Sequence, residues 1–139
     1  MEYRLIYCSR NRIDRSEQQI ALEIEKILES SRRNNEKHHI TGALLFNGLA
    51  FAQVLEGPRS AVEALYAIIC EDSRNSHNVL LETGDISKRD FARWSMAYSG
   101  PDREGRLYEH LKLAESEKDA SGVAKRVLDL LKSVVHAHV

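Results

Sequence analysis

The sequence predicts an α+β protein with a ferredoxin-like sheet, in the order β-α-β-β-α-β, to which a fifth strand is added. Three observations support this prediction. Short apolar runs with the two-residue period of strands alternate with two longer segments of helical period. An Asn-Gly pair separates two of the strands, and a Gly-Pro pair precedes the second helix. We expect both helices on one face of the sheet and C-terminal helices capping the other.

Length and charge narrow the possible classes of protein. The chain has 139 residues, the length of one domain, and its net charge of -1 does not favour direct binding to nucleic acid or to an anionic membrane. Its longest apolar run, Gly42 to Phe46, is too short to span a bilayer, and no leader is apparent at the N-terminus. Cys8 and Cys70 lack the spacing of a zinc site. We therefore expect a cytoplasmic domain without a metal site.

The first strand is predicted over Glu2–Cys8, where apolar residues occupy both faces. A polar loop is expected over Ser9–Arg15. Ser16 is a favourable N-cap, and Gln19 completes a capping-box pattern at the start of the first helix, which is expected to end near Asn34-Asn35. The helical stripe consists of Ile20, Ile24, Ile27 and Ser31.

The central hairpin is predicted from two apolar strands, Ile40–Phe46 and Leu49–Glu56. Asn47-Gly48 lies between them, and these two residue types tolerate the positive φ angles that a tight hairpin turn requires. Gly57-Pro58 ends the second of these strands, and a helix follows that is expected to end near Asp72. The stripe of that helix is Val62, Leu65 and Ile69.

The remaining strands are predicted at Val79–Glu82 and Trp94–Tyr98, and Gly100-Pro101 closes the unit. We therefore divide the chain into a domain over residues 1–100 and a helical extension over residues 101–139. Two helical patterns occupy the extension: Leu107, His110, Leu111 and Ala114, then Val123, Val127, Leu130, Leu131 and Val134. The second pattern suits a cover for the sheet and equally a contact surface in a homo-oligomer, because both need the same apolar stripe.

Three polar residues lie in apolar surroundings. Gln53 is an amide inside the apolar run Leu49–Leu55, and a buried amide without partners costs about 1 to 3 kcal/mol. Tyr7 lies on the neighbouring first strand, and Asn35 continues the stripe of the first helix. Taken singly, Tyr7 also suits a core aromatic and Asn35 the end of a helix. Together the three suggest a pocket for a flat ligand with a polar edge, between the two helices.

Five segments of the sequence resemble one known family. They are Tyr3–Tyr7, Ser30–Asn35, Ile40–Gly42, Phe51–Gly57 and Phe91–Met96. In this order and spacing they resemble the BLUF family, blue-light sensors that use a flavin. The resemblance covers residues 1–100 and implies the same five-stranded fold, with the flavin held between the two helices. It implies FAD as the cofactor, with FMN and riboflavin as open alternatives.

The resemblance also implies roles for single residues. Tyr7 matches the tyrosine that gives an electron and a proton to the excited flavin, and Gln53 matches the glutamine between that tyrosine and the ring. Asn35 matches the asparagine that hydrogen-bonds the polar edge of the ring. Ile27 and Ile69 match the side chains that sandwich it.

Further matches concern the relay of the signal and the tail of the cofactor. Trp94 and Met96 match a pair near the glutamine that is linked to output, and Ser31 matches a serine that meets the tryptophan. Asp72 and Arg74 are expected to bind the cofactor at its ribityl-phosphate end, although an exposed arginine is also often only solvated. The chain departs from the family pattern at two asparagines: Asn75 stands where many relatives have a histidine, and Asn34 where some have one.

The implied function is that of a photoreceptor and not an enzyme, signalling to an unidentified downstream protein. The alternative is a small phosphate hydrolase of the acylphosphatase type, in which Arg10-Asn11-Arg12 would hold a phosphate in the loop after the first strand. That chemistry also needs an asparagine on the second strand, whereas Asn47 is expected in the turn. The loop lacks the glycines that let backbone amides surround an anion.

Overall fold

Five strands form one mixed sheet in the order β4-β1-β3-β2-β5. The structure is a computed structural model that describes residues 2–13, 16–46, 48–99 and 120–137. The strands are β1 (Glu2–Asn11), β2 (Thr41–Phe46), β3 (Ala50–Gly57), β4 (Asn75–Ile86) and β5 (Ala97–Ser99). β1 pairs antiparallel with β3 and β4, β2 pairs antiparallel with β3, and β5 runs parallel to β2. The predicted ferredoxin-like sheet with an added fifth strand is confirmed.

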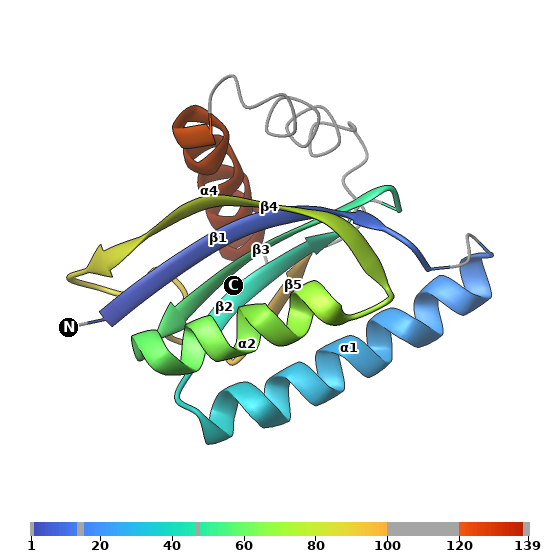
Figure 1. Cartoon of the computed structure of the whole chain (residues 1–139), viewed down its shortest axis with the longest axis horizontal. Helices are drawn as coiled ribbons and strands as arrows, with labels where there is room; N and C mark the ends of the chain where they lie inside the picture. The colour runs from blue at the N-terminus through green and yellow to red at the C-terminus, as the bar shows by residue number, and fades with distance from the viewer. Residues whose placement is uncertain (1, 14–15, 47, 100–119, 138–139) are drawn as a thin grey trace.

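Helices cover both faces of this sheet. The helices α1 (Glu17–Lys37) and α2 (Arg59–Glu71) lie side by side on one face, and α4 (Ala120–Ala137) lies on the other (Figure 1). Ser16 caps α1 as predicted, because its side chain accepts a hydrogen bond from the backbone N–H of Gln19 at 3.2 Å. The helix continues to Lys37, slightly beyond its expected end.

The alternation along β1 supplies side chains to two separate cores. Tyr3, Leu5 and Tyr7 belong to the cluster under α1 and α2. Ile6 and Cys8 belong to the cluster under α4. The predicted burial of both strand faces is therefore confirmed, since successive side chains of a strand point to opposite faces.

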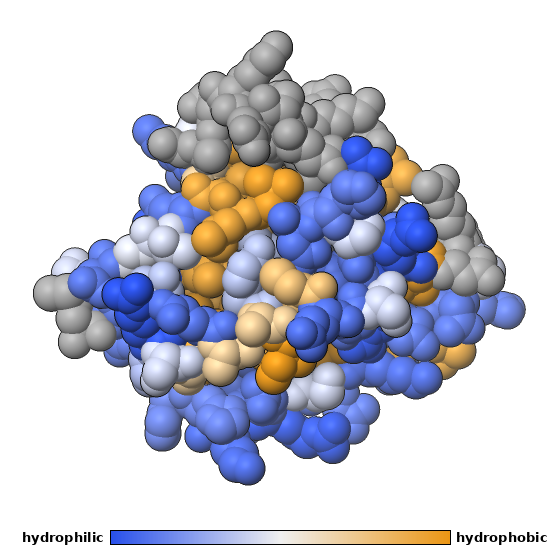
Figure 2. Space-filling view, in the orientation of Figure 1, coloured by the Kyte–Doolittle hydropathy of each residue, from blue (hydrophilic) through white to orange (hydrophobic). Residues whose placement is uncertain are grey.

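The C-terminal helix closes the second face of the sheet. Val123, Val127 and Leu131 of α4 are completely buried against it, which confirms the predicted cap. The earlier helical pattern, Leu107 to Ala114, lies outside the described residues, as does the side chain of Val134. The view in Figure 2 is mostly hydrophilic, with apolar residues gathered near its centre over β4.

The strands β1 and β4 are longer than the sequence predicts. β1 continues through Asn11 instead of ending at Cys8, because Arg10 pairs with Ala50 on one side and with Ser76 on the other. β4 spans Asn75–Ile86 and not only Val79–Glu82. Its pairing with β1 extends over this whole length, and its many polar residues on an edge strand hide the pattern from sequence analysis.

The fifth strand is shorter than predicted. It begins at Ala97, so Trp94 and Met96 lie in the segment that leads into it. That segment is nevertheless attached to the sheet, because the backbone N–H of Gly42 donates to the carbonyl of Trp94 at 3.1 Å. In the predicted hairpin turn Gly48 has a φ of 90°, as such a turn requires, while Asn47 lies outside the described residues.

Candidate functional site

A cavity of about 280 Å³ lies between α1, α2 and the sheet. Its apolar lining comes from Ile27 of α1, from Leu65, Ile68 and Ile69 of α2, and from Leu44 and Phe51 of the sheet. Its polar lining is Tyr7, Ser30, Ser31, Asn34, Gln53, Asp72, Arg74 and Asn75. An apolar slot with a few polar groups is typical of a small-molecule site.

Tyr7 and Gln53 meet at the floor of the cavity. They are directly opposite each other in the register of β1 and β3, so their side chains point to the same face. Tyr7 Oη donates a hydrogen bond of 2.5 Å to Gln53 Oε1, and Gln53 Nε2 lies 3.4 Å from Met96 Sδ. The glutamine predicted to need partners therefore has one on each side, in a chain from Tyr7 to Met96.

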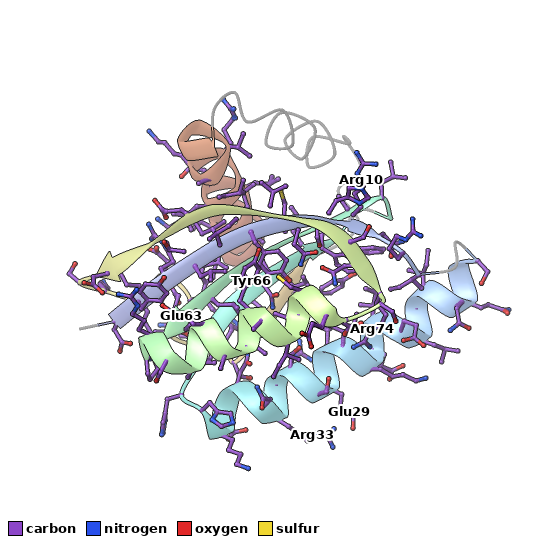
Figure 3. All side chains as sticks on the ribbon, in the orientation of Figure 1. Arg10, Glu29, Arg33, Glu63, Tyr66 and Arg74 are labelled. Atoms are coloured by element: carbon purple, nitrogen blue, oxygen red, sulfur yellow. The ribbon has the colours of Figure 1, made fainter. Side chains whose placement is uncertain are left out.

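A second aromatic ring lies beside Tyr7. The ring centroid of Tyr66 is 5.1 Å from that of Tyr7, and Figure 3 shows Tyr66 on α2. Burial raises the pKa of the Tyr7 phenol above its usual value, and the nearby Tyr66 raises it further. Burial likewise raises the pKa of Tyr66. Tyr7 is therefore a neutral phenol at physiological pH, with its proton directed at Gln53.

Asn35 is fully buried at the C-terminal end of α1. Its Nδ2 donates to the carbonyl of Ser95 at 2.7 Å, whereas its Oδ1 has no partner in the described part of the chain. Asn34, the residue before it, lines the cavity, and Asn35 does not. A buried acceptor without a donor is unusual in a native protein and is explained when a bound group supplies the donor.

The end of the cavity near the start of β4 is polar. Arg74, labelled in Figure 3, lies here. Its Nη2 is 2.6 Å from Asp72 Oδ2, and its Nη1 is 3.6 Å from Glu23 of α1. The hydrogen bonds from Arg74 lower the pKa of Asp72. Asn75 donates from Nδ2 to the carbonyls of Ile69 and Asp72, both at 2.9 Å. Its Oδ1 is the second buried acceptor that lacks a donor among the described residues of this site.

The structure separates Trp94 from Met96. Met96 is buried in the cluster under α1 and α2, where it contacts Gln53, while Trp94 packs against the cluster under α4. Ser31 lines the cavity on the Met96 side of the sheet. The structure therefore places Met96 at the glutamine and Trp94 toward the C-terminal helix.

These features fit a flat ring system with hydrogen-bonding edges. Ile27 and Ile69, on two adjacent helices, supply apolar surfaces for its faces. In the described part of the chain, Oδ1 of Asn35 and Oδ1 of Asn75 are buried acceptors without a donor, and of these two residues Asn75 lines the cavity. The residues present are therefore compatible with a flavin.

Sequence analysis missed two features of the site. Tyr66 was overlooked, although it lies on the same helix as the predicted stripe. Phe51 and Leu44 also line the cavity. Phe51 is two residues before Gln53 on β3, and Leu44 on β2 is the register partner of Gln53. Strand alternation and hairpin register could have identified both of these apolar residues.

The family model described as "Sensors of blue-light using FAD" matches residues 3–97 of this chain. The chain belongs to the BLUF family. It is a BLUF blue-light photoreceptor domain, and the BLUF family binds a flavin. The Tyr7–Gln53 hydrogen bond thus lies in a flavin photosensor. Arg10 and Asn11, which the hydrolase alternative places in a phosphate-binding loop, belong to β1.

Known BLUF proteins resemble this chain in sequence. The "Blue light- and temperature-regulated antirepressor BluF" of Escherichia coli (strain K12) is 38% identical over 73 residues, which are 52% of this chain and 18% of that protein. The "Photoactivated adenylate cyclase subunit beta" of Euglena longa is 38% identical over 77 residues, covering 54% of this chain and 9% of that protein. This chain thus spans less than a fifth of the length of either relative.

Short BLUF proteins resemble it over nearly its whole length. The dark-state structure of BlrB superposes with a TM-score of 0.77 and 31% identity, covering 98% of this chain and 96% of that one. The photo-activated structure of BlsA gives a TM-score of 0.76 and 28% identity, covering 95% of each chain. No helix in the described part of this chain is long and apolar enough to cross a membrane.

Proposed function

We propose that blue light drives the reversible departure of an electron and a proton from Tyr7 and rearranges the Gln53 amide, which gives a red-shifted signalling state. The observation that carries this proposal is the 2.5 Å hydrogen bond from Tyr7 Oη to Gln53 Oε1. It joins a phenol, an amide and Met96 in one chain of contacts at the floor of the cavity between α1 and α2.

Five residues would hold the cofactor. Ile27 and Ile69 would enclose the flavin ring, and Asn35 would accept a hydrogen bond from an N–H group at the edge of that ring. Asp72 and Arg74 would lie along the tail of the cofactor. FAD is the proposed cofactor. When bound, the flavin supplies the absorption of blue light and an excited state that accepts an electron.

Tyr7 is suited to lose an electron and a proton together. Burial raises the pKa of its phenol, so Tyr7 holds its proton until the electron leaves. Its proton already points at Gln53 Oε1, which gives the proton an acceptor at the moment the electron leaves. Return of both particles restores Tyr7 and leaves only the hydrogen-bond pattern altered.

Gln53 is suited to store that altered pattern. Rotation of its amide by half a turn would place Nε2 at Tyr7 Oη and Oε1 at Met96 Sδ. Met96 would then lose the amide donor that it faces in this structure. A tautomeric change of the amide would instead make Oε1 a donor and give Nε2 an acceptor lone pair, which also alters the group that faces Met96.

From Met96 the signal would pass to the C-terminal extension. Met96, Trp94 and Ser31 are the proposed relay, because the short segment from Trp94 to Met96 joins the glutamine on one face to the α4 cluster on the other. Residues 1–100 would form the photosensor and residues 101–139 the extension that acts on a downstream protein. Amide hydrogen exchange of α4 should differ between dark and illuminated protein. Equal exchange in a sample that shows the optical shift would contradict this route.

The absorption spectrum of the purified protein tests the proposal. We expect flavin bands that shift slightly to the red after blue light, without bleaching, and return in the dark. Protein that stays colourless after flavin is added would contradict flavin binding. Flavin bands that bleach, or do not change, would contradict the hydrogen-bond switch.

A further inference from the structure

A buried carboxylate lies outside the cavity, on the other side of the sheet. Glu56 follows Gln53 by three residues on β3 and is completely buried. Ala52 and Val54 of the same strand belong to the cluster under α4, so strand alternation places Glu56 on that side as well. A fully buried charge is costly unless hydrogen bonds or ions compensate it, so its partners indicate what it does.

The partners of Glu56 are mainly backbone groups of the segment before β5. Its Oε2 accepts from the N–H of Asp90 at 2.7 Å, and its Oε1 accepts from the N–H of Phe91 at 3.0 Å. The hydroxyl of Thr41, on β2, also donates to Oε1 at 3.1 Å. Hydrogen bonds from two successive N–H groups to one carboxylate fix both the position and the orientation of that backbone.

The hydrogen bonds that Glu56 accepts from Asp90 and Phe91 act as a clamp on this backbone. Further hydrogen bonds lead from this clamp to the proposed relay residues. The N–H of Trp94 donates to the carbonyl of Phe91 at 3.0 Å, and the carbonyl of Trp94 accepts from Gly42 of β2. On the cavity side, the carbonyl of Met96 accepts from Arg32 of α1 at 3.2 Å. The segment from residue 90 to residue 96 is thus held at one end by Glu56 and at the other by α1.

The same segment also contacts the C-terminal helix. The Asp90 carboxylate lies 3.2 Å from Lys132 of α4 and 3.2 Å from Arg4 of β1. Arg4 is the register partner of Glu56 across the β1–β3 pair and also binds Glu82 at 2.8 Å. Asp90 therefore donates its backbone N–H to Glu56 and contacts Lys132 of α4 with its side chain.

We propose that Glu56 is a positioning residue of the photosensor, whose carboxylate sets the backbone of residues 90–96 and thereby the contact of Met96 with Gln53 and of Trp94 with the α4 side. The inference rests on the proposed function, in which Gln53 is the switch. Glu56 acts through this segment and needs no contact with the cofactor. Its loss should change how fast the switched state relaxes.

The decisive variant is Glu56→Gln, which keeps the size of the side chain. It replaces one acceptor oxygen by an NH₂ group that faces a backbone N–H, so one hydrogen bond of the clamp is lost. Glu82→Gln is the matched control, because it removes an exposed carboxylate that binds the same Arg4. Trp94 is the single tryptophan of the chain, so quenching of its fluorescence by acrylamide reports on this segment with or without flavin.

We expect Glu56→Gln to change both Trp94 quenching and the dark-recovery rate by at least about twofold, the lower end of what one lost hydrogen bond produces. Glu82→Gln should leave both within experimental error. Wild-type values in a folded Glu56→Gln protein would overturn the proposal, as would equal changes in the control. Changed quenching with unchanged recovery would also overturn it, because Glu56 would then be only structural.

Glu56→Asp covers the case in which Glu56→Gln does not fold. Its shorter carboxylate keeps the charge but cannot reach both N–H groups in the present geometry, so a smaller change of quenching and recovery is expected. Wild-type values for both would overturn the proposal. If wild-type protein shows no optical shift, the proposed function fails by itself, whereas a normal shift with an unaffected variant refutes only the role of Glu56.

Discussion

The two faces of the sheet use the same strands but are packed in different ways. Under α4 the face is filled by fully buried apolar side chains such as Ile6, Val54 and Leu131, and the buried Glu56 on this side is hydrogen-bonded. Under α1 and α2 the face encloses a cavity, and Tyr7 and Gln53 are buried at its floor. The filled face stabilises the fold, so the hollow face can keep a space and buried polar groups that cost free energy.

The largest effect on the hollow face is expected from Tyr7→Phe. This change keeps the ring but removes the hydroxyl, so we expect retained flavin and complete loss of the light-induced shift. Tyr3→Phe is the control, since Tyr3 is a buried tyrosine on the same face of the same strand but does not line the cavity. It should keep the full shift. A shift in Tyr7→Phe as large as in wild type would refute the role of Tyr7.

The filled face is tested by Leu131→Ala. Truncating this fully buried leucine should lower the free energy of unfolding by about 2 to 5 kcal/mol, because a cavity forms in a packed core. Leu80→Ala is the control, because Leu80 is 45% exposed, and a change of less than about 1 kcal/mol is expected. Urea denaturation measures both. A loss in Leu131→Ala no larger than in Leu80→Ala would contradict the division of roles between the faces.

The hollow face is tested by Asn35→Ala. Loss of the amide removes the bond to Ser95 and the unpartnered Oδ1, so we expect flavin affinity to fall at least about fivefold. The dark spectrum should also move, and flavin titration measures the affinity. Asn78→Ala, on β4 and away from the cavity lining, should bind like wild type. An unchanged affinity and dark spectrum in Asn35→Ala would show that Asn35 only anchors Ser95.

The smallest effect concerns the rim of the cavity and its pH dependence. Arg74 holds the pKa of Asp72 below its ordinary value of about 3.8, so the carboxylate stabilises the fold above that pH. This contribution is lost as pH falls through the lowered pKa. Asp72→Asn should therefore cost less than about 1 kcal/mol at pH 7, and the difference from wild type should shrink toward zero in acid.

Unfolding followed by circular dichroism at neutral and acidic pH measures this difference. Glu71→Gln, which removes an exposed carboxylate at the same end of α2, serves as the control and should match wild type at pH 7. A difference between wild type and Asp72→Asn that grows on acidification would contradict the sign of the pKa shift.

Local patterns were sufficient for the order of the elements and for much of the site. The cap at Ser16, the turn at Gly48 and the alternation along β1 each depend on neighbours in sequence, and each is confirmed. Seven of the predicted site residues line the cavity: Tyr7, Ile27, Ser31, Gln53, Ile69, Asp72 and Arg74. Their grouping followed from which strands are adjacent in this fold and from the family resemblance.

Long-range contacts decided what the sequence left open. The sequence by itself determined the fold class, the two-sided core and the polar residues within it, because periodicity and turn chemistry are local properties. Only the tertiary structure decided that β4 pairs with β1 along its full length and that Met96 and Trp94 belong to opposite faces of the sheet. It also decided that Glu56 accepts hydrogen bonds from the backbone N–H groups of Asp90 and Phe91. Each of these depends on hydrogen bonds and packing between residues far apart in the chain, which no local pattern records.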